Sequence, residues 1–306
     1  MTYAGLISKY VWLVDTIRRF QPIGLDEIRS RYERKWGAEL SERTFHRHRN
    51  AIQDIFGISV SYVASQRGYS VESGDGSVGE WILDSLSVGA VFAGAHDLRG
   101  RILLENVPSG RNFLEPVLAA MREGRIVELT HENFFRNQPR TFCVEPWFVK
   151  LFLQRWYLVG RLEGQEGIRT FGLDRIVSLE QTDRRFSLPP DADPQRLFGD
   201  SYGIITSDED FGVVPVALWV EAHQSKYLES LPLHHSQVCV CRGEGYSIFE
   251  MRLCPAFDFR QKLLSMGGAV RVLAPKELHD ALRDMAYGAD DAPGEYVFKC
   301  YTEGNG

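Results

Sequence analysis

The sequence predicts an α+β protein built from several modules, and three observations carry this prediction. A chain of 306 residues is too long for one small domain. Apolar residues recur at helical spacing before residue 57, whereas short runs rich in β-branched and aromatic residues follow one another between 126 and 179. From residue 214 the segments alternate in the order β-α-β-β-α-β, which is typical of a ferredoxin-like unit. We therefore expect a helical N-terminal module, a central β-barrel and a C-terminal α+β module.

The N-terminal module, residues 1–73, is predicted to hold three helices and a hairpin. Apolar positions recur at helical spacing in 6–20 and again in 25–36, and Pro22 marks the break between these helices. A hairpin is expected over 58–71. Three short helices followed by a hairpin describe a winged helix-turn-helix.

The third helix is the best specified element of this module. Ser41 is a natural N-cap, and Leu40 before it can pack on Phe45 as a hydrophobic staple. Gly57 ends the helix. The residues expected to face the core are Phe45, Ile52 and either Ile55 or Phe56.

The opposite face of the third helix is polar and basic. Arginine and amide side chains on the leading turns of an exposed helix are the residue types that read base edges in a major groove. Residues 1–70 contain 11 Lys and Arg against 7 Asp and Glu, a net charge of +4, so the rest of the −6 chain carries −10. This distribution favours nucleic-acid contact by the first module. The alternative is a helical bundle whose polar face is merely solvated. The predicted DNA-binding residues are Arg43, Thr44, His46, Arg47, Asn50 and, at the bend of the hairpin, Arg67.

Residues 74–124 are predicted to form a helical connector. Gly, Ser and Asp dominate 73–77, which indicates a short linker. Apolar residues beginning at Trp81 suggest helical structure, and a further helix is expected over 113–121. Pro116 is acceptable there only in the first turn.

The central module, residues 125–187, is predicted to be a small β-barrel. Short strands with tight connections favour a barrel over a parallel sheet. In one strand, period-2 alternation places Arg155 and Tyr157 on one face and Trp156 and Leu158 on the other. The expected strands are 126–131, 142–149, 156–161, 169–173 and 176–179.

Three motifs in this module resemble those of the WYL-domain family of bacterial regulators. They are V-E-P-W-F-V at 144–149, R-W-Y-L-V at 155–159 and R-T-F-G-L-D-R-I at 169–176. The resemblance implies that the barrel is SH3-like or Sm-like. The stretch L-L-S-M-G-G-A-V-R-V-L at 263–273 resembles the extension that often follows WYL domains. This extension is expected over 213–306, after a linker at 188–212.

The resemblance also implies a function. It indicates a DNA-binding transcriptional regulator, a repressor rather than an activator, that acts as a homodimer on a double-stranded operator. Its barrel would sense a nucleic-acid fragment or a nucleotide-like effector, and phage-defence or DNA-damage-response genes are the implied targets. The alternative is an RNA- or single-strand-binding accessory factor whose main contact is the barrel.

A cationic and aromatic set of residues on neighbouring barrel strands is the predicted effector site. Guanidinium groups match phosphate geometry, and a phenol or imidazole can stack on or hydrogen-bond a base. The candidates are His131, Arg155, Tyr157, Arg169 and Arg175. His131 stands where the family commonly has Tyr, and Gly172 replaces a usual Arg, so the site is expected to be less basic than in the family. The alternative for Arg175 is a structural pair with Asp174 or Glu145.

Other classes of protein are disfavoured by what the sequence lacks. It contains no P-loop, no G-x-G-x-x-G after a strand, no H-E-x-x-H and no nucleophile elbow, so we expect neither an enzyme nor a cofactor. The five cysteines form no C-x-x-C pair, which argues against a metal site and favours reduced thiols. No apolar run reaches the roughly 18 residues that cross a bilayer, and no signal peptide is recognisable, so a cytoplasmic location is expected.

Overall fold

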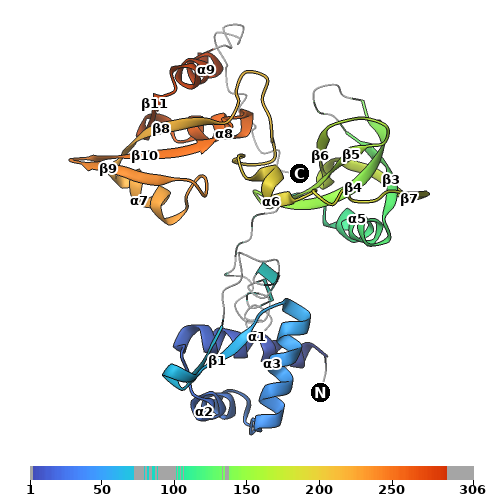
Figure 1. Ribbon diagram of the computed structural model, residues 1–306, viewed down its shortest axis with the longest axis vertical. Helices are drawn as coiled ribbons and strands as arrows, with labels where there is room; N and C mark the ends of the chain where they lie inside the picture. The colour runs from blue at the N-terminus through green and yellow to red at the C-terminus, as the bar shows by residue number, and fades with distance from the viewer. Residues whose placement is uncertain are drawn as a thin grey trace, which may run out of the picture. The chain divides into compact units, whose positions relative to one another are not determined.

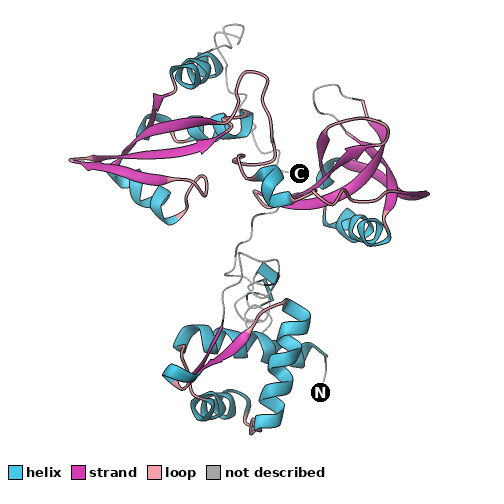
Figure 2. Cartoon of the chain, in the orientation of Figure 1, coloured by secondary structure: helices cyan, strands magenta, loops and turns pink. Residues whose placement is uncertain are grey.

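The computed structural model describes residues 3–71, 107–132 and 138–287, with a few single positions between 79 and 105 and Phe134. The chain divides into two compact units, Met1–Glu105 and Asn106–Gly306. Helices dominate the first unit (Figure 1), and the second contains two antiparallel sheets, drawn as magenta arrows in Figure 2. The helical connector predicted around Trp81 falls largely outside the described residues.

The described part of the N-terminal unit contains three helices and a two-stranded sheet, which confirms the predicted elements. They are α1 (Tyr3–Phe20), α2 (Leu25–Trp36), α3 (Glu42–Phe56), β1 (Val60–Val63) and β2 (Gly68–Val71). The turn before α2 is joined to the hairpin, because Ile23 and Tyr69 exchange two backbone hydrogen bonds of 3.1 and 2.8 Å. The ring of Tyr69 also packs on Phe45 of α3, with centroids 4.7 Å apart. The hairpin is therefore held against the helices.

Helix α3 shows how the sequence sets the core of this unit. Gly57 ends the helix at a φ of 67°, a conformation that favours glycine. Phe45, Ile52 and Phe56 are buried, whereas Ile55 is 49 % exposed. Phe56 rather than Ile55 is thus the third inward residue, because only the former continues the stripe of the other two.

The first sheet of the second unit has five antiparallel strands in the order β6-β5-β4-β3-β7. Helix α5 packs against it and adds Val117 and Ala120 to a core that includes Leu129 and Leu158. The elements are α5 (Arg111–Glu123), β3 (Arg125–His131), β4 (Arg140–Phe152), β5 (Arg155–Leu162), β6 (Ile168–Gly172), η3 (Leu173–Arg175) and β7 (Ile176–Arg185).

Two details of this region differ from the prediction. Helix α5 begins at Arg111, so Pro116 lies inside the helix and not in its first turn. Leu173 was expected to end a strand but begins the 3-10 turn η3, which carries Asp174 and Arg175. All five predicted strands are present, and β4 and β7 are longer than expected. Strand β7 continues through the polar residues 180–185, and β4 continues to Phe152.

The second sheet has the order β11-β8-β10-β9, and every neighbouring pair is antiparallel. Its core contains Leu218, Phe249, Phe259 and Leu263. The elements are α6 (Pro194–Phe198), β8 (Val214–Glu221), α7 (Ala222–Ser230), β9 (Val238–Gly243), β10 (Tyr246–Leu253), α8 (Phe257–Ser265), η4 (Gly267–Ala269), β11 (Val270–Ala274) and α9 (Lys276–Tyr287). The predicted β-α-β-β-α-β order is confirmed, and among the described helices none is long and apolar enough to cross a membrane.

Candidate nucleic-acid interface and effector pocket

The outer face of α3 presents the residues predicted to contact DNA. Arg43, Arg47 and Asn50 are exposed, on the side of the helix opposite Phe45 and Ile52. His46 is partly exposed, and its Nε2 lies 3.7 Å from Glu42 Oε1. The outer face of α3 therefore offers cationic and amide side chains to the exterior.

Thr44 has a local structural role in α3, whereas Arg67 is an exposed residue of the hairpin. The Thr44 backbone N–H donates to Ser41 Oγ at 3.2 Å, and its hydroxyl accepts from the Ser41 hydroxyl at 2.9 Å. Thr44 thus completes the N-cap of α3. Arg67 is exposed at the bend between β1 and β2, with a φ of 50°.

His48, on the inner side of α3, was not singled out from the sequence. It is 2 % exposed, and its ring meets the Tyr10 ring edge-on at 5.1 Å. Burial, reinforced by the charges of Arg47 and Lys9, lowers the pKa of His48 to about 4. This histidine is a neutral core residue.

Asp174 lies within the predicted effector site, although the sequence suggested it only as a structural partner for Arg175. Its side chain is 7 % exposed, and Oδ2 accepts a hydrogen bond of 3.1 Å from Arg155 Nη1. Oδ1 is buried without a hydrogen-bond partner in the described part of the chain. A side chain at Gly172 would collide with this oxygen and crowd Arg175, since a Cβ there would lie 2.8 Å from Oδ1 and 3.1 Å from Arg175 Nε.

His131 closes one side of this site at the end of β3. It is buried, and its ring meets Phe171 edge-on at 5.4 Å. Burial, followed by the charge of Arg175, lowers the pKa of His131 to about 4, against the opposing effect of a hydrogen bond with the Gly172 backbone. Its Nε2 is buried and has no hydrogen-bond partner among the described residues. The imidazole is therefore neutral and retains an unsatisfied polar atom.

Tyr157 lies on β5, directly opposite Gly172 of β6. It is 9 % exposed, and burial, followed by the charge of Asp174, raises the pKa of its phenol, while Arg155 and Arg175 act in the opposite direction. Tyr157, Asp174 and the two arginines therefore share one electrostatic environment.

The structure brings together four of the five predicted effector residues. Arg175 lies over the Phe134 ring at 5.6 Å and beside Gly172, in the same cluster as His131, Arg155 and Tyr157. Arg169 is exposed on β6 opposite Gly160, three residues before Gly172. Within the described ranges, no hydrogen bond or ion pair joins Arg169 to the cluster.

The alternative pairing of Arg175 with Glu145 is wrong. Glu145 is directly opposite Arg161 in the sheet, and the two side chains form a bidentate pair with two bonds of 3.0 Å. Trp147 Nε1 donates to the same carboxylate at 3.2 Å. The partner of Glu145 follows from strand register, which the sequence alone did not define.

A segment that we call the strap, residues 198–206, crosses the face of the sheet that carries Tyr157. Lys150, opposite Tyr157, donates to the Gly203 carbonyl at 2.6 Å and lies over the Phe198 ring at 3.7 Å. Thr170 donates to the Ile204 carbonyl at 3.3 Å. Burial lowers the pKa of Lys150 to about 8, although the charge of Asp258 opposes this shift.

The strap is also hydrogen-bonded to the first turn of α8. Asp258 Oδ2 accepts the backbone N–H groups of Ile204 and Ile205 at 2.8 and 3.2 Å. The strap therefore links β4 and β6 to α8 through specific hydrogen bonds. No group of three or more His, Cys, Asp or Glu residues in the described part of the chain is arranged to hold a metal ion.

Comparison with known proteins assigns the class of both parts of the second unit. Residues 112–181 match the WYL domain and residues 212–289 match the WCX domain. The chain therefore carries a WYL domain followed by a WCX domain, as the motifs predicted.

Its curated relatives include two mycobacterial proteins. Protein PafC of Mycobacterium tuberculosis is 27 % identical over 194 residues, which cover 61 % of this chain and 57 % of PafC. Protein PafB of Mycobacterium bovis is 32 % identical over 95 residues, which cover 31 % of this chain and 27 % of PafB. The matched region thus spans little more than half of PafC.

Two solved structures are also similar over most of the chain. Proteasome accessory factor B/C (PafBC) of Arthrobacter aurescens is 18 % identical and matches 99 % of this chain and 50 % of its own, with a TM-score of 0.37. A structure described as a CRISPR Cas-related protein is 11 % identical and matches 94 % of this chain and 82 % of its own, with a TM-score of 0.39.

Proposed function

We propose that this protein is a DNA-binding transcriptional regulator that represses its target genes as a homodimer. The observation that carries the proposal is the capped helix α3, whose Arg43, Arg47 and Asn50 are exposed along its first nine residues. These residue types read guanine and adenine in the major groove. The hairpin held against α3 supplies a wing with Arg67 at its bend.

The proposal extends to the WYL domain, which we assign as the sensor of a nucleic-acid fragment or nucleotide-like effector. His131, Arg155, Tyr157 and Arg175 surround Asp174, and a phosphate of the effector would replace the Asp174 carboxylate at Arg155. Arg169, outside the cluster, would contact the flank of a longer ligand. The strap then offers a route from this face to α8.

Strand order supports the finer fold assignments within the same proposal. The meander β3 to β7, with β6 and β7 at its edges, is compatible with an SH3-like or Sm-like barrel. The order β11-β8-β10-β9 supports a ferredoxin-like WCX domain. Because α5 packs in the core of the first sheet, we place the start of the sensor domain at α5 and not at residue 125.

Duplex binding by α3 variants tests the proposal. Arg43→Ala and Arg47→Ala should each weaken binding to a protected duplex from the protein's own promoter by about 1–3 kcal/mol, if each contacts a guanine. Arg122→Ala, an exposed change on α5, is the matched control and should leave binding unchanged. Fluorescence anisotropy at one fixed salt concentration gives the comparison, since salt alone changes the affinity.

Unchanged duplex affinity in both folded variants would contradict the winged-helix assignment. The second candidate, an RNA- or single-strand-binding factor, is favoured by the cations and phenol gathered around Asp174. Loss of single-strand binding in Arg175→Ala, in a protein that binds no duplex, would decide for that candidate.

A further inference from the structure

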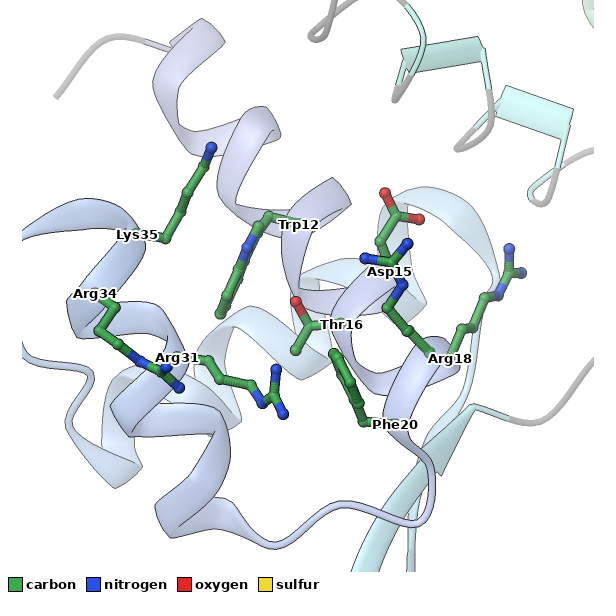
Figure 3. A pocket seen from close by; sticks show the side chains of 9 residues that line it. Trp12, Asp15, Thr16, Arg18, Phe20, Arg31, Arg34 and Lys35 are labelled. Carbon is green, nitrogen blue, oxygen red and sulfur yellow. The ribbon is translucent and has the colours of Figure 1, made fainter.

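A basic groove lies between α1 and α2 of the N-terminal unit, separate from the exposed face of α3. The groove is open to the exterior and has a volume of about 850 Å³, and the exposed residues of α3 do not line it. Five cationic residues line it, namely Arg18, Arg19, Arg31, Arg34 and Lys35. Trp12 and Phe20 provide aromatic walls (Figure 3).

Helical spacing explains why these cations meet. Arg31, Arg34 and Lys35 stand at i, i+3 and i+4 on α2, beside the stripe that buries Ile28 and Tyr32. Arg18 and Arg19 belong to the last turn of α1. The core contacts that pack α1 on α2 therefore leave both sets of cations along one groove.

The side chains at the base of the groove are held in place. Arg31 donates to Glu27 Oε1 at 3.0 and 2.7 Å, and its guanidinium stacks on the Phe20 ring at 3.6 Å. Figure 3 shows Arg31 reaching from α2 towards Phe20 and Thr16 of α1. Trp12 packs edge-on against Tyr32 at 5.6 Å. A ligand would therefore meet a preformed surface of fixed rings and one fixed guanidinium.

The net positive charge of the groove favours an anionic ligand. Five cations and one carboxylate, that of Asp15, line it, although the whole chain carries −6. Like charges around a shared hollow repel one another, and a multivalent anion relieves that repulsion. Guanidinium groups fit the oxygens of phosphate bidentately, and Trp or Phe rings stack on a planar base.

We propose that this groove binds a nucleoside polyphosphate. The phosphates contact Arg34, Lys35 and Arg19 at the rim, and the base lies against Trp12. The volume is that of a small-molecule site and suits a ligand of this size. This site is independent of the duplex contact of α3 and of the sensor site in the WYL domain.

Calorimetric titration of the whole 306-residue chain tests the proposal, with ATP and inorganic triphosphate as the two probes at 0.15 M salt. ATP should bind more tightly than triphosphate, because only ATP carries a base for Trp12. The double variant Arg34→Gln/Lys35→Gln should weaken the binding of both probes by about tenfold or more, since each probe loses charge-assisted hydrogen bonds. The matched control Arg122→Gln/Lys226→Gln removes two exposed positive charges elsewhere and should leave both affinities unchanged.

A further variant separates ring recognition from charge. Trp12→Leu should reduce the affinity for ATP to that for triphosphate without changing the latter, and thermal melting verifies that the variant is folded.

Several results would overturn the proposal. They are no binding of either probe, equal binding by wild type and the Arg34→Gln/Lys35→Gln variant, and equal affinities for ATP and triphosphate in the wild type. Loss of ATP binding in Arg175→Ala would move the site to the WYL domain. If ATP and triphosphate do not displace each other, and only a single-stranded oligonucleotide binds tightly, the groove would be assigned to a nucleic-acid strand instead.

Discussion

Asp174 is bonded to Arg155 through only one of its two carboxylate oxygens, and the other oxygen is buried. The Asp174 side chain is 7 % exposed and that of Arg155 is 42 % exposed, so the carboxylate depends on the arginine more than the reverse. Removing Arg155 would leave a buried carboxylate without this charge-assisted bond. We therefore expect Arg155→Ala to lower the free energy of unfolding by about 1–3 kcal/mol.

Urea unfolding measures this effect, and Arg169→Ala is the matched control. Arg169 is exposed on β6, and its removal should change stability by no more than about 0.5 kcal/mol. Equal losses in the two variants would show that the Arg155–Asp174 pair contributes nothing specific.

The sensor role predicts separate effects on effector response and duplex binding. Arg175→Ala should leave duplex affinity without effector nearly unchanged, because Arg175 lies outside the N-terminal unit. The same change should abolish the response of a preformed operator complex to a short single-stranded oligonucleotide. A coupling of about 1–3 kcal/mol corresponds to a 5- to 150-fold change in operator affinity, which anisotropy resolves easily. Identical titrations for the wild type and the variant would exclude this class of effector.

His48 predicts an acid-sensitive N-terminal unit. Its pKa is lowered from 6.5 to about 4 by burial, so between these values the unfolded chain binds a proton that the folded chain does not. The free energy of unfolding should therefore fall as pH decreases from 6.5 to 4, by up to about 1.4 kcal/mol per pH unit. His48→Phe keeps a ring beside Tyr10 and should remove this slope. A variant as acid-sensitive as the wild type would assign the slope to other groups.

Lys150 leads to a prediction about stability at alkaline pH. Its pKa is lowered from 10.5 to about 8 by burial, so the unfolded state binds more protons between pH 8 and 10.5. The free energy of unfolding of the second unit should rise with pH across this window. Lys150→Met keeps the apolar stem and should flatten the rise, whereas Lys226→Met, an exposed change on α7, should not.

Homodimerisation is predicted because half-site reading by helix-turn-helix proteins is naturally two-fold. Sedimentation equilibrium at micromolar concentration should give twice the chain mass of 34.8 kDa. The connector around Trp81 and the WCX domain are the expected contact surfaces. A single species of one chain mass would count directly against the prediction.

Local sequence signals predicted the helices and strands well, but they did not predict contacts between residues that are distant in the sequence. The N-cap Ser41 and the terminal Gly57 defined α3, and alternation defined the strands of the WYL domain. The role of Lys150 depends on Gly203, 53 residues further along the chain, and the pairing of Glu145 depends on the register of β4 with β5. The basic groove was within reach of sequence analysis, because Arg31, Arg34 and Lys35 already share one helical face.

The strap also provides a built-in reporter. The N–H groups of Ile204 and Ile205 both donate to one carboxylate, that of Asp258, while the Ile204 carbonyl accepts from Thr170 in the WYL domain. A ligand that moves β4 or β6 must therefore change the solvent protection of these two amides. Their deuterium uptake, or their amide chemical shifts, would register occupancy of the WYL domain without any DNA in the sample.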